Sequence, residues 1–158
     1  MARRVVKGDK IPDFSLPDHT GQDRSLTGFL ADGPIALFFY PAAMTKGCTI
    51  ESCHFRDLGA EFTEAGGQRV GISRDSVDKQ RQFAELHDFD YPLLSDPDGT
   101  VAERLGVKRS LPLGPLSTRR MTFVIDTDRT ILEVIHSEVS MTGHADRALE
   151  VLRHRPGS

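Results

Sequence analysis

Cys48 is the residue of this sequence best suited to nucleophilic chemistry. It follows an apolar run at residues 35–40 and stands where a helical pattern begins. A thiolate is the reactive form of cysteine, and the free N–H groups and partial positive charge at a helix N-terminus favour it. Thr45 and Lys46 add a hydroxyl group and a positive charge nearby. This pattern indicates a reactive cysteine at the carboxyl end of a strand, the edge where open α/β sheets bind their ligands.

Cys53 is the second cysteine, five positions after Cys48. In an intact α-helix, residues five apart point about 140° away from each other, and their Cα atoms lie roughly 8.7 Å apart. A disulfide requires Cα atoms within about 7 Å. A bond between the two sulfurs therefore requires residues 48–53 to unwind, which costs least in the first turns of a helix. Two buried, chemically inert cysteines are the alternative interpretation.

Arg120 is a candidate partner for the Cys48 sulfur, because it immediately precedes a second apolar run at residues 121–126. If this run forms a strand antiparallel to residues 35–40, Arg120 and Cys48 share one edge of the sheet. A guanidinium there would stabilise a thiolate and present a rigid set of donors to an oxygen-containing substrate. An ordinary solvated arginine at a loop–strand junction is the alternative.

The elements that position these side chains alternate between strands and helices. The run at residues 35–40 is apolar throughout, which is typical of a strand buried on both faces. The pattern predicts an irregular or hairpin entry at 8–23, strands at 70–73, 91–94, 121–126 and 131–135, and helices at 48–65, after Ser76, at 98–106 and at 145–152.

These elements define one topology. A helical crossover makes the first strands parallel, whereas the short connection at residues 127–130 forces the last two strands into an antiparallel hairpin. The predicted fold is therefore α/β and thioredoxin-like, with a mixed central β-sheet flanked by helices. The length of 158 residues suits one domain, and we expect residues 1–158 to form a single domain.

Composition excludes several functional classes. The 20 basic and 23 acidic residues give a net charge of −3, which predicts no nucleic-acid or anionic-membrane partner. The apolar run at 35–40 is far shorter than the roughly 18 residues of a membrane span. The first residues lack the apolar segment of a secretory signal, and two cysteines do not make a disulfide scaffold. We therefore expect a cytoplasmic protein.

The segment before Cys48 resembles the P-x-x-x-T-x-x-C signature of peroxiredoxins, with Pro41 and Thr45 at the other fixed positions. Cys53 is similar to the resolving cysteine of the bacterioferritin comigratory protein, or peroxiredoxin Q, subfamily. Residues 120–126 are similar to the arginine-bearing strand of that family, and residues 71–73 and 91–96 also fit. The resemblance spans about residues 7–152. Lys46 stands where the family usually has a proline, which removes a rigid element from the loop.

The resemblance implies a thiol peroxidase. Cys48 would be the peroxidatic cysteine and would attack the O–O bond of a hydroperoxide, while Thr45 and the Cys48 N–H group hold the peroxide oxygens. Arg120 would stabilise the thiolate and the polarised bond. Pro41 would shield the site from water, and Glu51 would orient Arg120.

The resemblance also implies a recycling route. The Cys48 sulfenic acid would condense with Cys53 to an intramolecular disulfide, which thioredoxin or a similar dithiol would reduce. No metal or organic cofactor is implied. The subfamily resemblance suggests a monomer or a weak homodimer, and it leaves the preferred hydroperoxide open.

Three other interpretations stay open at this point. A copper-binding module would use the cysteines with some of the six histidines, but the close ligand sets of structural metal sites are missing and we expect most histidines at the surface. A general thiol–disulfide oxidoreductase would have C-x-x-C spacing. A structural thioredoxin-like module would leave the joint placement of Thr45, Cys48, Cys53 and Arg120 without explanation. The histidines are His19, His54, His87, His136, His144 and His154.

Residues 106–119 form a basic connection rich in leucine, proline and glycine. Such a segment suits either a solvated loop or an apolar surface for a partner or substrate beside the site. The sequence leaves both interpretations open.

Overall fold

The computed structural model describes residues 4–108 and 118–155 and confirms the predicted mixed sheet. The strands of this sheet are β3 (Ile35–Phe39), β4 (Gln68–Ser73), β5 (Leu93–Ser95), β6 (Met121–Ile125) and β7 (Ile131–His136). Their order is β5-β4-β3-β6-β7. The pairs β3–β4 and β4–β5 are parallel, and the pairs β3–β6 and β6–β7 are antiparallel. The crossover and the hairpin expected from the sequence are therefore both present.

Two short strands form a separate antiparallel hairpin near the start of the chain. They are β1 (Ser15–Pro17) and β2 (Asp23–Ser25). Helix α1 (Leu26–Leu30) follows directly, and the Ser25 side chain caps it by accepting a hydrogen bond from the Gly28 N–H at 3.0 Å. The hairpin agrees with the prediction for this region, whereas α1 is too short to give a periodic signal.

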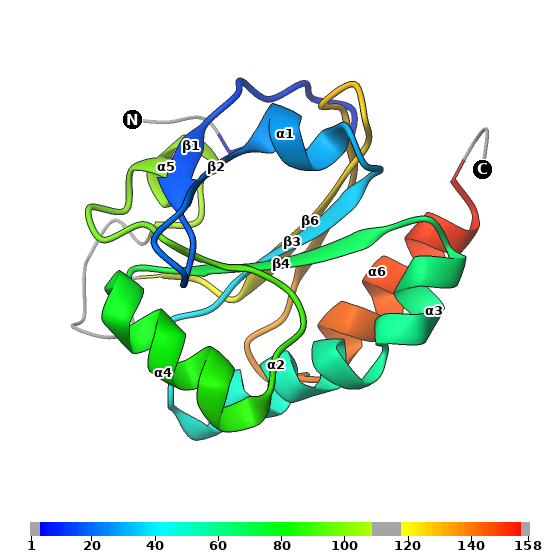
Figure 1. Cartoon of the computed structure of the whole chain (residues 1–158). Coiled ribbons are helices and arrows are strands. Elements are labelled where there is room, and N and C mark those ends of the chain that lie inside the picture. The colour runs from blue at the N-terminus through cyan, green and yellow to red at the C-terminus, as the bar shows by residue number, and fades with distance from the viewer. Residues whose placement is uncertain (1–3, 109–117, 156–158) are drawn as a thin grey trace.

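Helices cover both faces of the main sheet (Figure 1). Helices α2, α3, α4 and α6 lie on one face, and α1 and α5 lie with the β1–β2 hairpin on the other. Their bounds are Lys46–Asp57 for α2, Gly59–Glu64 for α3, Val77–His87 for α4, Thr100–Arg104 for α5 and Gly143–Arg153 for α6. This arrangement is the thioredoxin-like architecture. In the part of the chain that the structure describes, no helix has the length and apolar character needed to cross a bilayer.

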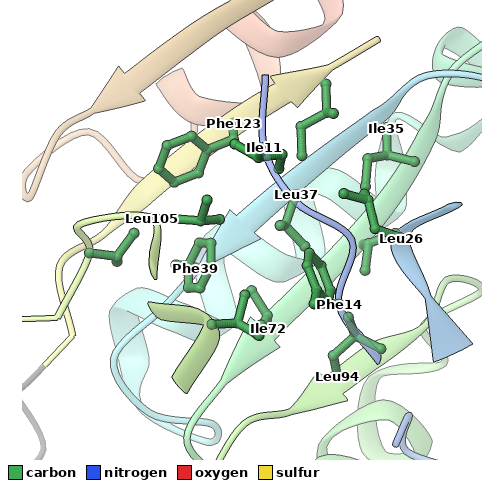
Figure 2. Close-up of a cluster of buried hydrophobic side chains, with 14 of the residues drawn as sticks. Ile11, Phe14, Leu26, Ile35, Leu37, Phe39, Ile72, Leu94, Leu105 and Phe123 are labelled. Atoms are coloured by element: carbon green, nitrogen blue, oxygen red, sulfur yellow. The ribbon is translucent and has the colours of Figure 1, made fainter. Parts of the chain in front are cut away.

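The buried strands divide the core into two layers, because successive side chains of a strand point to opposite faces. Leu37 and Phe39 pack with α1 and α5, and Figure 2 shows this cluster around Phe14, Ile72 and other apolar side chains. Phe38 packs on the opposite face with the helices α2, α3, α4 and α6. Burial on both faces explains why β3 is apolar at every position.

One helix expected at residues 48–65 is two helices, α2 and α3, with a break at Leu58. The buried Arg69 guanidinium explains the break. It donates to the carbonyl oxygens of Phe55 at 3.0 Å and Arg56 at 3.4 Å. In a continuous helix these carbonyls would accept from residues four positions later. The arginine thus ends α2, and the prediction of one uninterrupted helix is wrong.

The register of β3 and β6 places the candidate residues together. Phe39 at the end of β3 is opposite Met121 at the start of β6, so Arg120 lies at the edge where the chain leaves β3. The antiparallel pairing on which this placement depends is therefore present. Residues 109–117 of the 106–119 connection lie outside the described residues, and a bridge between Lys108 and Thr118 joins its ends.

Candidate active site

The loop between β3 and α2 is anchored to the strand beside it. The Ala43 N–H donates to the Asp75 carboxylate at 2.7 Å, and the Ser73 hydroxyl donates to the same oxygen at 2.6 Å. Pro41 is half-buried in this loop. Because Asp75 lies two residues after the end of β4, these hydrogen bonds fix the loop, and with it the start of α2, at the edge of the sheet.

Cys48 lies in the first turn of α2, which begins at Lys46, two residues earlier than predicted. Its N–H is one of the first four of the helix, which have no partner within the helix. The thiol is free, and the residue is only 1% exposed. The sulfur is therefore shielded from bulk water but placed at the positive end of a helix dipole.

Arg120 contacts this sulfur directly. Its Nη2 lies 3.4 Å from the Cys48 Sγ, and the residue is 6% exposed. A Cβ atom at Gly47 would lie 3.3 Å from the same Nη2, so the missing side chain of Gly47 lets the guanidinium approach the first turn of α2. The structure thus brings the predicted arginine and the predicted cysteine together.

Glu51 holds the other side of the Arg120 guanidinium. Its Oε1 accepts from Arg120 Nη1 at 2.7 Å, and the carboxyl group is fully buried. Burial raises the pKa of Glu51 to about 8, although the charge of Arg120 acts in the opposite direction. Burial alone would lower the pKa of Arg120, but the charges of Glu51 and Cys48 outweigh it and the net shift is upward.

Thr45 precedes the first residue of α2 and is exposed. Its hydroxyl donates to the Ala42 carbonyl at 2.7 Å and makes no cap bond to the helix. The hydroxyl therefore bonds within the loop and not to the Cys48 sulfur. A role toward a bound oxygen stays a prediction.

Cys53 lies on the same uninterrupted helix as Cys48 and is partly exposed, with a free thiol. Burial raises the pKa of this thiol. Two contacts anchor the part of α2 around Cys53 to neighbouring elements. The Tyr91 hydroxyl donates to the Ser52 carbonyl at 2.7 Å, and His54 Nε2 lies 2.7 Å from an Asp146 carboxylate oxygen on α6. Forming a disulfide would require this segment to unwind.

His144 on α6 is a residue whose place the sequence did not reveal. It is fully buried and so is an exception to the expectation that most histidines lie at the surface. Its Nδ1 lies 2.8 Å from the Thr122 hydroxyl, and its Nε2 lies 2.8 Å from the Ser137 carbonyl. Its Nδ1 is also 3.8 Å from Glu51 Oε2. Because both ring nitrogens have partners, the ring is tolerated in the interior.

A metal centre would be another use of the histidines and cysteines. In residues 4–108 and 118–155, no three histidine, cysteine, aspartate or glutamate side chains are grouped closely enough to hold a metal ion.

A thioredoxin-like sheet with a cysteine, an arginine and a buried glutamate at one edge defines a class of thiol-dependent redox enzymes. Residues 7–134 match the AhpC/TSA family, and the chain belongs to that family. It is a peroxiredoxin of the Bcp and Q group. Peroxiredoxin Bcp of Escherichia coli K12 is 38% identical over 149 residues, which cover 92% of this chain and 94% of that protein.

Two solved structures extend the likeness to three dimensions. Peroxidoxin BcpB of Mycobacterium tuberculosis superposes with a TM-score of 0.91 at 59% identity, covering 96% of this chain and 98% of that one. The bacterioferritin comigratory protein of Xanthomonas campestris has a TM-score of 0.81 at 29% identity, with 89% and 90% coverage. The Xanthomonas protein has alkyl peroxide reduction activity.

Proposed function

We propose that this peroxiredoxin reduces hydroperoxides with Cys48 as the attacking nucleophile. The observation that supports this role best is the 3.4 Å contact between Arg120 Nη2 and the Cys48 sulfur at the first turn of α2. A guanidinium at this distance stabilises the thiolate relative to the thiol. The low exposure of the sulfur strengthens that interaction, because water screens it poorly.

The peroxide step is a displacement at oxygen. The Cys48 thiolate supplies the electron pair for a new S–O bond to the terminal oxygen of the hydroperoxide, and the O–O bond breaks. The leaving oxygen takes a proton and departs as an alcohol, or as water from hydrogen peroxide. Cys48 is oxidised to a sulfenic acid. Arg120 and the Cys48 N–H would bind the oxygens as negative charge develops on them.

Three nearby residues would support this step. Thr45 directly precedes α2, and a rotation of its hydroxyl away from Ala42 would offer a hydrogen bond to a bound peroxide. Glu51 would keep Arg120 in place through its 2.7 Å bond. Pro41 would limit access of water to the loop side of the sulfur. Substitution of each residue tests its role.

Recycling would use Cys53. Its thiolate attacks the sulfur of the Cys48 sulfenic acid, an S–S bond forms, and the hydroxyl group leaves as water after taking a proton. Unwinding of residues 48–53 would bring the sulfurs together. It would also expose the Cys53 thiol and remove the burial that raises its pKa in the folded helix. Thioredoxin or a similar dithiol would then reduce the disulfide.

Organic hydroperoxides would be substrates in addition to hydrogen peroxide. Met44 in the loop and Ile50 on α2, two exposed apolar side chains at 39% and 43%, belong to the segment that carries Cys48. They suit the alkyl group of a substrate such as the one that the Xanthomonas relative reduces. We further propose that the enzyme works in the cytoplasm as a monomer or a weak homodimer, without nucleic-acid or membrane partners.

The test is peroxide consumption with a thioredoxin system. The wild-type protein should consume hydrogen peroxide and cumene hydroperoxide continuously, and Cys48→Ser should be inactive with both. Cys53→Ser serves as the matched control, because it should complete one turnover and then stop. Equal activity of the wild-type protein and Cys48→Ser would contradict the proposed role of Cys48.

A further inference from the structure

Arg69 on β4 is buried against the end of α2, with 9% of its surface exposed. Its Nη1 donates to the Phe55 carbonyl at 3.0 Å and, in a longer shared bond, to the Arg56 carbonyl at 3.4 Å. The two carboxylate oxygens of Asp90 accept from Nη1 at 2.9 Å and from Nη2 at 3.0 Å. The last turn of α2 is therefore tied to the sheet by a planar charged group that Asp90 holds in a fixed orientation.

The junction between α2 and α3 leaves room for this guanidinium. A Cβ atom at Gly59 would lie 3.2 Å from both Nη1 and Nη2 of Arg69, and 3.3 Å from Asp90 Oδ2. The Arg69 Cζ also lies 5.1 Å from the centre of the Tyr91 ring, whose hydroxyl donates to the Ser52 carbonyl. These contacts place the guanidinium at the junction and the Tyr91 hydroxyl about one turn of α2 before it.

Unwinding of residues 48–53 would leave the end of α2 with few contacts of its own. Each N–H group of an α-helix donates to the carbonyl four positions earlier, so the N–H groups of residues 52–57 would lose their acceptors. The Leu58 N–H, which donates to the His54 carbonyl at 3.1 Å, would keep its bond. Residues 55 and 56 would then be held by contacts with other elements, and the guanidinium bonds their backbone.

Phe55 is the side chain that this anchor keeps in the core. It is fully buried, and its ring stacks on that of Phe38 with the ring centres 4.0 Å apart and an angle of 6° between the planes. The centre of the Phe62 ring lies 5.8 Å away on its α3 side. Cys53 is two residues before Phe55 and has to leave the helix to meet Cys48. A fixed backbone at Phe55 lets Cys53 move while the core stays closed.

We propose that Arg69 is a positioning residue for the disulfide step, because it stops the unwinding of α2 before Phe55. It confines the opened segment to residues 48–54 and keeps the last turn of α2 in place. After reduction of the disulfide, the helix can re-form from this turn and avoid the unfavourable nucleation of a new helix. The inference rests on the proposed disulfide between Cys48 and Cys53.

Arg69→Met tests this role, since methionine is an unbranched side chain that donates no hydrogen bond. The carboxylate of Asp90 is 61% exposed, so the substitution leaves no unpaired charge in the interior. The disulfide form is prepared with diamide, an oxidant that takes two electrons and two protons from the thiols and replaces peroxide. Amide hydrogen exchange of the reduced and disulfide forms, measured by peptide mass spectrometry, then compares residues 48–54 with residues 55–64.

In the wild-type protein, the disulfide should accelerate exchange in residues 48–54 and leave residues 55–64 as slow as in the reduced form. In Arg69→Met, the disulfide should also accelerate exchange in residues 55–64, by about tenfold for two lost hydrogen bonds. The reduced variant should change much less, because the intact helix still holds its last turn. An arginine with a purely structural role would affect residues 55–64 equally in both forms.

Arg24→Met is the matched control. Arg24 on β2 also pairs with a carboxylate, that of Asp18 at 3.2 Å, and lies 4.5 Å from the centre of the Phe29 ring. It lies with the β1–β2 hairpin on the other face of the sheet. This variant should leave exchange in residues 48–64 as in the wild-type protein, in both forms.

Faster exchange of residues 55–64 in the disulfide form of the wild-type protein, or equal acceleration in both forms of Arg69→Met, would overturn the proposal. If Arg69→Met does not fold, Asp90→Asn decides the question. It removes the charge that orients the guanidinium and should give the same pattern with a smaller amplitude, whereas wild-type exchange would overturn the proposal. Diamide treatment that yields no Cys48–Cys53 disulfide would overturn it as well. A failure to consume peroxide, by contrast, bears on the proposed role of Cys48 alone.

Discussion

The Arg120 guanidinium bridges Cys48 and Glu51, with one nitrogen 3.4 Å from the sulfur and another 2.7 Å from the carboxyl oxygen. Both partners are on α2, three residues apart, and therefore on one side of the helix. Arg120 comes from the edge of β6, so this contact joins the helix to the sheet across the reacting sulfur. We propose that the same guanidinium orients the first turn of α2 and stabilises a thiolate at Cys48.

Arg120→Lys should slow the reaction of Cys48 with hydroperoxide. Lysine keeps the positive charge but cannot donate to Cys48 and Glu51 in the fixed planar geometry of a guanidinium. Loss of one preorganised donor at a site of developing charge costs roughly 100-fold in rate. Stopped-flow measurement of the single-turnover rate gives the value. Arg104→Lys on α5 is the control, and equal rates in both variants would refute the role of the guanidinium.

Tyr91→Phe should accelerate formation of the Cys48–Cys53 disulfide. The substitution removes the buried hydrogen bond to the Ser52 carbonyl and keeps the aromatic ring, so unwinding of α2 becomes easier. A lost bond of this kind corresponds to about a fivefold change. The rate is measured after one equivalent of peroxide by rapid acid quench and mass spectrometry.

Tyr40→Phe is the matched control for that experiment. Its buried hydroxyl donates to the Gln80 side chain at 2.6 Å and not to α2. The disulfide rate of this variant should therefore equal that of the wild-type protein. If Tyr91→Phe and Tyr40→Phe behave alike, release of the Ser52 carbonyl does not limit the resolving step.

The buried Glu51 carboxyl should make stability depend on pH. Its pKa is raised from 4.5 to about 8 in the folded protein, so the folded state binds this proton more tightly than the unfolded state. The contribution to the free energy of unfolding is therefore full below pH 4.5 and is lost as the pH rises toward 8. Compared with Glu51→Gln, the wild-type protein should lose more stability across this range in urea titrations.

Glu64→Gln, a substitution at an exposed position of α3, is the control for the pH effect. Its free energy of unfolding should follow the wild-type pH dependence. Parallel pH curves for wild-type protein and Glu51→Gln would mean that the carboxyl titrates similarly in the folded and unfolded states.

The mixed sheet could be predicted from sequence because local patterns determine it. An apolar run with a helical crossover gives parallel strands, and a four-residue connection gives an antiparallel pair. The contact between Arg120 and Cys48 needed one more condition, the antiparallel pairing of β6 with β3, which neither pattern determines. Glu51 is three positions from Cys48, so its place on the same side of α2 also follows from helix geometry.

The break in α2, the burial of His144 and the direction of the Thr45 hydroxyl could not be predicted, because they depend on tertiary contacts or on loop conformation. The break at Leu58 arises because Arg69, on a strand, donates to carbonyls of α2, and no local pattern reports this. His144 is paired with Thr122 from β6 and Ser137 after β7, so its burial follows from tertiary packing. The direction of the Thr45 hydroxyl depends on a loop conformation that residue types alone do not specify.

The most direct test of the account is the identity of the residue that peroxide oxidises. Cys53→Ser is treated with one equivalent of hydroperoxide in the presence of dimedone, which traps sulfenic acids, and the protein is mapped by peptide mass spectrometry. We expect one dimedone adduct on Cys48 in this variant, and a Cys48–Cys53 disulfide in the wild-type protein after the same oxidation. Peroxide consumption without an adduct on Cys48 would contradict it.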